Sequence, residues 1–290
     1  MIDRRRLLLG VAGAGLLAGG TTAGPAQAQL SSNWPLPQPT TPPAASPLPP
    51  VPAPTVAPLP TSAPTTTAAE LPLALVYRGP ASSPGCPESA AALLQTAPRP
   101  FRTAYVGPQE KLKITKNVLD TATVYVQPGG GTLSAAWVAM QPYANVIRNW
   151  VSGGGNYLGF CLGGYLAGAT PGFKLLPGDT WQYITAADAT VTTTDAARIT
   201  VLWRGEPRTL YFQDGPVFEL NSNHTAQILA TYAGGQAAAV VADYAAGRVG
   251  VVAPHPEAHS GWFRSDGLSP TNAIHPELGH DLIETTVYGG

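Results

Sequence analysis

The chain has 290 residues, and its 16 lysines and arginines nearly balance its 17 aspartates and glutamates, giving a formal net charge of −1. A composition so nearly neutral, with so few charged residues, gives no sign of the clustered basic surface that nucleic-acid binding requires, and we expect no nucleic-acid partner. Only two cysteines occur, Cys86 and Cys161, so a disulfide within the chain has one pairing to consider.

The first 28 residues have the order of an export signal. A basic start at residues 4–6 precedes an apolar run at residues 7–17 and an A-x-A cleavage pattern at residues 26–28. Paired arginines before a mildly hydrophobic core are typical of a twin-arginine signal, which exports folded proteins. The alternative is a retained membrane anchor, although the apolar core is short and glycine-rich for a span. We therefore expect an exported protein, extracytoplasmic or secreted, whose mature chain starts near Gln29.

Residues 29–70 are predicted to form a disordered tether. Residues 31–69 are dominated by proline, alanine, threonine, serine and leucine, and they contain no charged residue. Each proline removes a backbone donor and disfavours helix in the residue before it. Such a segment buries too little apolar surface to offset the entropy of ordering, so we expect an extended, polyproline-like spacer. Its expected use is association with a cell wall or a membrane surface, and the alternative is a ligand for proline-recognition domains.

Residues 71–290 have a length suited to one domain. Apolar runs of strand length alternate there with helix-like segments, with strands at 73–77, 101–106, 122–126 and 157–160 and helices at 86–95, 115–119 and 133–150. That alternation predicts an α/β fold with a mostly parallel sheet and helices on both faces. From residue 180 the pattern becomes β-rich, with strands at 189–193, 199–203, 209–213, 228–232, 237–244 and 248–253 and a closing helix at 276–287.

The stretch NYLGFCLGGY at residues 156–165 is the organising element of this domain. A short apolar run reaches Cys161 in a G-x-C-x-G frame, and a helix-compatible stretch of small residues follows. Glycines beside a sharp strand-to-helix turn remove the Cβ clashes of so tight a bend, as a nucleophile elbow requires. The N-terminus of the following helix favours thiolate over thiol. The alternative is a buried structural cysteine at the end of a core strand.

A glycine loop, PGGG at residues 128–131, also follows a predicted strand. The loop and Cys161 therefore share the carboxyl edge of the parallel sheet, where open α/β folds build their sites. We expect the backbone N–H groups of Gly129 or Gly130, together with that of Leu162, to form an oxyanion hole beside the sulfur.

His255 and Glu257 come directly after another strand-like run, with Pro256 between them. Residues two apart in an extended chain face the same way, so we expect Glu257 to hold the imidazole while His255 takes the thiol proton. A metal cluster of His255, Glu257 and His259 is not expected, because Pro256 forbids the helix that aligns an H-E-x-x-H site.

Cys86 and Gln127 complete the set of candidate residues. Cys86 follows the first strand at the same edge of the sheet as Cys161. It is either a redox partner that forms a disulfide with that thiol, or a small apolar residue at a helix start. Gln127 precedes the glycine loop, and it either supports this loop from the pocket side or simply ends the strand.

Three motifs in order, P-G-G-G, G-x-C-x-G-G and H-P-E, resemble the class I glutamine-amidotransferase-like superfamily with its Cys-His-Glu triad. A closer resemblance is to the domain at the N-terminus of some biotin-protein ligases, through VYRGP at 76–80, PGCP at 84–87, YVQPGGG at 125–131 and FQDGP at 212–216. The similarity covers roughly residues 71–257. It implies a flavodoxin-like fold and a cysteine nucleophile. It does not imply biotin transfer, because no ligase or nucleotide-binding domain follows.

The expected function is hydrolysis of an amide-type C–N bond by a cysteine nucleophile, with no cofactor and no metal. The substrate class is a small-molecule or peptide-like amide. A non-catalytic binding module on the same fold is one alternative, and an enzyme that acts on a carbonyl adduct is another. The oligomeric state stays open.

Overall fold

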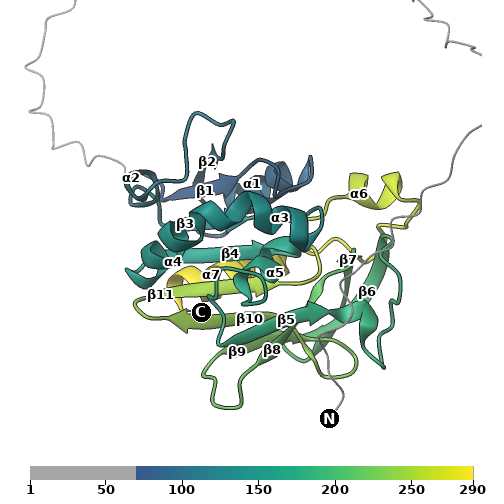
Figure 1. Cartoon of the computed structure of the whole chain (residues 1–290). Coiled ribbons are helices and arrows are strands. Elements are labelled where there is room, and N and C mark those ends of the chain that lie inside the picture. Colours follow the sequence, from purple (N-terminus) through teal and green to yellow (C-terminus); the bar gives the residue numbers. More distant parts are fainter. Residues whose placement is uncertain (1–69, 290) are drawn as a thin grey trace, which may run out of the picture. The chain divides into compact units, whose positions relative to one another are not determined.

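The computed structural model of the chain describes residues 70–289 (Figure 1). The predicted export signal and the predicted tether, apart from Glu70, lie outside the described residues. Within residues 70–289 no helix is both long enough and apolar enough to cross a bilayer.

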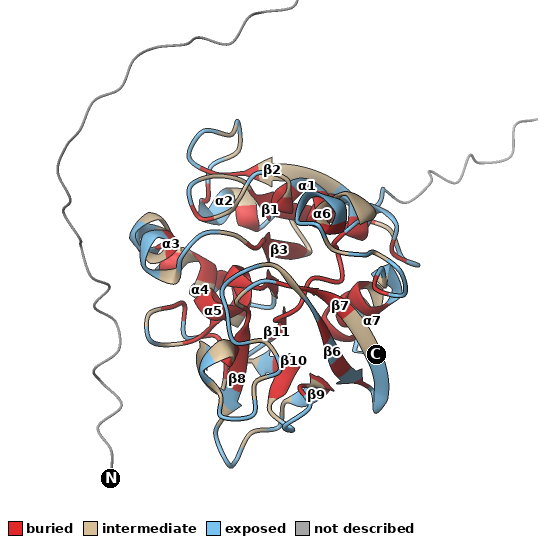
Figure 2. Cartoon of the chain, turned by 90° about the vertical axis from the view of Figure 1, so that its right-hand side faces the viewer, coloured by how far each residue is buried: buried red, intermediate tan, exposed pale blue. Residues whose placement is uncertain are grey.

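Five parallel strands form one half of the sheet, in the spatial order β2-β1-β3-β4-β11. Their bounds are Leu73–Tyr77 for β1, Arg102–Val106 for β2, Val124–Gln127 for β3, Asn156–Phe160 for β4 and Gly247–Val252 for β11. Every residue of β1 and β3 is buried, as expected for continuous apolar runs covered on both faces (Figure 2). This half of the sheet places the carboxyl ends of β1, β3, β4 and β11 along one edge.

The other half of the sheet is antiparallel and continues from β11 in the order β10-β9-β6-β7. Its strands are Ala237–Tyr244 for β10, Gln227–Thr231 for β9, Ala197–Trp203 for β6 and Glu206–Phe212 for β7. A further antiparallel pair, β5 (Gly178–Gln182) and β8 (Pro216–Leu220), joins through β8 to β10. The tight turn between β10 and β11 joins them as a hairpin.

Helices cover both faces of the parallel half. Helices α1 (Cys86–Gln95) and α7 (Pro276–Tyr288) pack together on one face, while α3 (Leu133–Met140), α4 (Ala144–Ser152) and α5 (Leu162–Ala167) lie on the other (Figure 1). Two short helices, α2 (Lys116–Leu119) and α6 (Ser260–Ser265), complete the domain. The prediction of an α/β fold with helices on both faces and a β-rich second half is therefore confirmed, and the sheet as a whole is mixed.

Two predicted elements are wrong, each for a local reason. The single helix expected at 133–150 is divided by a 3-10 turn at Gln141–Tyr143, because Pro142 lacks the N–H that a continuous helix needs there. The strand expected at 189–193 does not form. The backbone N–H of Thr190 donates instead to the hydroxyl of Tyr183 at 3.0 Å, so it is not available to a neighbouring strand. Strands β5 and β8 and helix α6 were not predicted.

Candidate active site

Cys161 stands at the turn between β4 and α5, in a backbone conformation that few L-residues adopt. Its φ is 47° and its ψ is −101°, and such strain persists only where the surroundings enforce it. The enforcement comes from close packing. A Cβ on Gly163 would lie 2.0 Å from the carbonyl oxygen of Gln127, and the N–H of Cys161 donates to Val252 of β11 at 2.8 Å. The bend is therefore a nucleophile elbow in geometry, pinned on both sides by the neighbouring strands.

Cys161 is 7% exposed and directly follows β4, at the carboxyl edge of the sheet. Its Sγ donates to the backbone carbonyl of Gln213, which lies 3.4 Å away in the segment between β7 and β8. The residue also occupies the N-cap position of α5, where its side chain makes no capping hydrogen bond. The segment at Gln213 is a neighbour of the thiol that the sequence pattern did not indicate.

His255 and Glu257 form a buried pair immediately after β11. Their Nδ1 and Oε1 atoms lie 2.7 Å apart, and the side chains are 4% and 0% exposed. The extended geometry expected for this pair is wrong. The N–H of Ala258 donates to the carbonyl of His255 at 3.2 Å, which closes a turn, and the turn brings the carboxylate back to the ring. The rings of Tyr211 and Trp262 pack edge-on against the imidazole and fix its plane.

The imidazole of His255 lies next to Cys161. A Cβ placed on Gly129 would be 2.8 Å from Cε1 of His255 and 3.5 Å from Cβ of Cys161, so both side chains border the same small space. Burial by itself lowers the pKa of His255. The charge of Glu257, together with charge and hydrogen-bonding interactions with Cys161, outweighs burial and raises this pKa from 6.5 to about 10. The surroundings therefore favour the imidazolium.

The glycine loop faces this group. None of the turn and loop hydrogen bonds within residues 70–289 is donated by the N–H of Gly129, Gly130 or Leu162. Gly130 has a φ of 111°, and a Cβ there would lie 2.3 Å from the backbone nitrogen of Ser83. The loop is thus held against the β1–α1 connection in a conformation that requires glycine, and its N–H groups are left available to a ligand.

Cys86 and Gln127 are the remaining candidate residues. Cys86 is the first residue of α1, its thiol is free like that of Cys161, and burial followed by the charges of Glu257 and Cys161 raises its pKa to about 12. Gln127 ends β3 and is fully buried. Its Oε1 accepts from Tyr125 at 2.8 Å and its Nε2 donates to the carbonyl of Ala81 at 2.9 Å, so it joins the end of β3 to the segment between β1 and α1.

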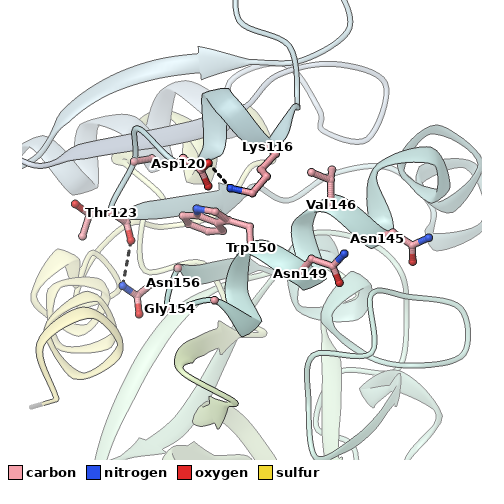
Figure 3. Close-up of a pocket in the computed structure, with 12 residues that line it drawn as sticks. Lys116, Asp120, Thr123, Asn145, Val146, Asn149, Trp150, Gly154 and Asn156 are labelled. Atoms are coloured by element: carbon pink, nitrogen blue, oxygen red, sulfur yellow. Dashed lines mark hydrogen bonds and ion pairs between the residues drawn. The ribbon is translucent and has the colours of Figure 1, made fainter.

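A surface cleft of about 830 Å³ opens at the opposite edge of the sheet (Figure 3). Trp150, Asn149 and Asn156 contribute to its wall, near the amino ends of β3 and β4. Its lining contains no cysteine and no histidine. The chemistry-bearing residues are therefore gathered at the carboxyl edge, away from this cleft.

Comparisons with known proteins relate part of the chain to one family and the domain to one fold. Residues 73–185 match the family model "Biotin-protein ligase, N terminal". The solved structure of a glutamine amidotransferase aligns with 15% identity and a TM-score of 0.50, over 74% of this chain and 98% of that one. A glutamine amidotransferase from Thermotoga maritima aligns with 14% identity and a TM-score of 0.51, over 76% of this chain and 99% of that one. Comparison with curated proteins gives no match.

The likeness to the solved structures concerns the fold alone. The family model covers the part of the domain that carries the glycine loop and Cys161. The matched segment includes β1, the glycine loop and the elbow at Cys161, and it ends before the turn that carries His255 and Glu257. Residues 73–185 therefore match the biotin-protein ligase N-terminal family, and the fold of the domain is similar to that of class I glutamine amidotransferases.

Proposed function

We propose that this domain is a cysteine hydrolase that cleaves an amide-type C–N bond. The observation that carries the proposal is the strained elbow at Cys161 with the buried His255–Glu257 pair beside it. A strained backbone that presents a thiol to a charge-coupled imidazole is costly for folding and useful for nucleophilic catalysis. No cofactor and no metal enter the proposal. Within residues 70–289, no group of three His, Cys, Asp or Glu side chains lies together as a metal-ligand set.

The proposed reaction begins when Sγ of Cys161 bonds to the carbonyl carbon. The carbonyl oxygen becomes an oxyanion, which accepts hydrogen bonds from the N–H groups of Leu162 and Gly129 or Gly130. His255 holds the thiol proton as the imidazolium, which Glu257 stabilises, and gives this proton to the leaving nitrogen as the C–N bond breaks. Water, which gives a proton to His255, then attacks the thioester carbon. The C–S bond breaks, the thiol is reprotonated, and a carboxylic acid and an amine have formed.

A thioester at Cys161 is the test of this proposal. The chain would be incubated with a panel of amides, and the acyl adduct on the Cys161 peptide would be sought by mass spectrometry. We expect an adduct with some of these amides and none in Cys161→Ala. A panel that yields no adduct, while amide ligands still bind, would favour a binding role instead.

A non-catalytic binding module is the second candidate. The observation in its favour is that Cys161 is 7% exposed and its thiol already donates to the carbonyl of Gln213. A nucleophile so enclosed needs the segment at Gln213 to shift before a substrate reaches it. Ligand binding that leaves Cys161 unmodified would support this second candidate.

We also propose that the chain is exported, because residues 1–28 have the order of a signal peptide. The expected observation is protein outside the cytoplasm that starts near Gln29, as read by N-terminal sequencing. Recovery of the intact chain only from the cytosol, with its initial arginines present, would contradict export. The association of the tether with a cell wall or a membrane surface is tested by the same fractionation.

A further inference from the structure

The cleft at the amino edge of the sheet has no part in the proposed reaction. This amino-edge cleft is lined by residues 116, 120, 122–123, 145–146, 149–150 and 153–156, from helices α2 and α4, the glycine turn before β4, and the starts of β3 and β4 (Figure 3). Its volume of about 830 Å³ falls within the range of small-ligand sites, about 300–1,000 Å³. The residues that line it decide which ligand it suits.

Trp150 is fixed in the wall of this cleft by the glycine turn. A Cβ on Gly155 would lie 2.4 Å from Cε2 of the indole, so only glycine lets the turn pack against the ring. Trp150 is 9% exposed. Its Nε1 has no hydrogen-bond partner within residues 70–289, and yet it is not among the atoms shielded from solvent. The ring is therefore buried, while its N–H donor is available to a ligand in the cleft.

Three asparagines add both donors and acceptors. Nδ2 of Asn156 donates to the carbonyl of Thr123 at 3.0 Å, which leaves Oδ1 as an acceptor. Oδ1 of Asn145 accepts from Arg148 at 2.6 Å, which leaves Nδ2 as a donor. The exposed amide of Asn149, one helical turn further along α4, has no side-chain partner in the described part of the chain. The cleft therefore offers a mixed set of neutral hydrogen-bonding groups.

The lining carries no net charge. Its only charged residues, Lys116 and Asp120, are paired with each other at 2.5 Å. An anion would have to displace Asp120 from the lysine, and a cation would have to displace Lys116 from the aspartate. An apolar ligand would take water from the amides and the indole N–H without replacing its hydrogen bonds. Hydroxyl groups fit this set, because each of them both donates and accepts.

We propose that the amino-edge cleft binds a neutral polyhydroxylated ligand, that is, an uncharged saccharide. A peptide backbone also donates and accepts, but the side chains of a peptide need apolar contacts. Ala122 and Val146 are the only aliphatic residues in the lining. The saccharide is therefore the better match, and its binding does not depend on the proposed hydrolase function.

The experiment titrates the isotope-labelled full chain with three uncharged trisaccharides, maltotriose, cellotriose and chitotriose. NMR follows the indole N–H signals of the six tryptophans, and the signal of Trp150 is the one that disappears in Trp150→Phe. At least one trisaccharide should shift this signal to saturation. Because the ligand is uncharged, its Kd should be the same in low and in high salt. Trigalacturonate, which is anionic, and acetyl-trialanine amide, a neutral peptide, should not shift the signal.

Asn149→Ala is the informative variant, because this side chain is exposed and its loss should leave the fold intact. The Kd of the trisaccharide should rise roughly 2- to 10-fold, the effect of one lost hydrogen bond. Asn117→Ala is the matched control, since Asn117 is an exposed residue of α2 next to Lys116 but does not line the cleft. It should bind like the parent chain.

Cys161→Ala separates this inference from the proposed function. The variant should lose any thioester and keep the Kd of the trisaccharide, because the cleft lies at the other edge of the sheet. The saccharide site would be overturned if none of the three trisaccharides shifts the Trp150 signal, or if Asn149→Ala and Asn117→Ala bind equally well. A shift produced by the peptide and by none of the saccharides would overturn it in favour of a peptide site.

Discussion

Nδ1 of His255 and Oε1 of Glu257 lie 2.7 Å apart in a part of the molecule that solvent does not reach. The second carboxylate oxygen of Glu257 is buried and has no partner among the described residues. A carboxylate in that position requires a positive neighbour, because an unpaired buried charge is costly. The pair therefore behaves as one charged unit, and the state of the imidazole depends on its acidic partner.

Replacing Glu257 with glutamine tests this dependence. The change keeps the size of the side chain but removes a charge that raises the pKa of His255, so this pKa should fall. NMR titration of the imidazole measures it. Amide hydrolysis, where present, should fall by roughly 10²–10⁴-fold, the range expected when a triad loses its orienting carboxylate.

A matched control for this variant exists at the surface. His275 and Glu277 have the same spacing and the same 2.7 Å contact, but the side chains are 21% and 61% exposed. Glu277→Gln should leave hydrolysis and the His255 titration unchanged. An unchanged pKa of His255 in Glu257→Gln would contradict the coupled pair.

The two thiols should differ in reactivity. The thiolate is the form that alkylates, and burial raises the pKa of Cys86 to about 12, so this thiol should react very slowly near neutral pH. Cys161 lies beside an imidazolium and should be labelled first, as measured by peptide mass spectrometry over time. His255→Ala should slow the labelling of Cys161. Equal alkylation rates for the two cysteines, with and without His255, would contradict the assignment of Cys161 as the nucleophile.

Much of the parallel half was readable from the sequence, because each of its elements has a local cause. Leu73–Tyr77 is apolar at every position, and β1 has the predicted bounds. The glycines around Cys161 predict a sharp turn, and the structure has this turn, with a positive φ at Cys161. The prediction of one continuous helix at 133–150 was wrong, because its apolar spacing runs through Pro142. Proline lacks the backbone N–H that a continuous helix needs at this position.

The features of the site that could not be predicted from the sequence depend on contacts between segments far apart in the chain. Nothing local indicates that the carbonyl of Gln213 meets the thiol of Cys161, because the two residues are brought together by the antiparallel half of the sheet. Nothing local indicates, either, that the buried hydroxyl of Tyr165 has no hydrogen-bond partner among the described residues. Its spacing of four residues from Cys161 was visible, but its lack of a partner was not. His255 and Glu257 were paired from an assumed extended chain, whereas a turn unites them.

Adding one methyl group to the glycine loop should disturb the site more than the fold. In Gly129→Ala the new Cβ would lie 2.8 Å from Cε1 of His255, closer than real Cβ contacts allow, so the ring must move. We expect slower alkylation of Cys161 and little change in secondary structure by circular dichroism. Gly153→Ala is the control, because its Cβ would meet only two carbonyl oxygens at 3.4 Å and its φ is −83°. Equal effects of the two variants on Cys161 would argue against close packing of His255 on the loop.

The charge on His255 should also appear in the pH dependence of stability. The folded-state pKa, about 10, lies above the ordinary value of 6.5, so folding favours the protonated ring. The resulting stabilisation is fully present below pH 6.5 and is lost as the pH rises through 10, by an amount on the order of a few kcal/mol. Urea unfolding at pH 6.5 and at pH 10 measures it. The free energy of unfolding should fall more steeply for the parent chain than for Glu257→Gln, in which the pKa of His255 is lower. Parallel pH profiles for the two proteins, or a parent chain that gains stability relative to the variant as the pH rises, would show that His255 is not held as an imidazolium in the folded state.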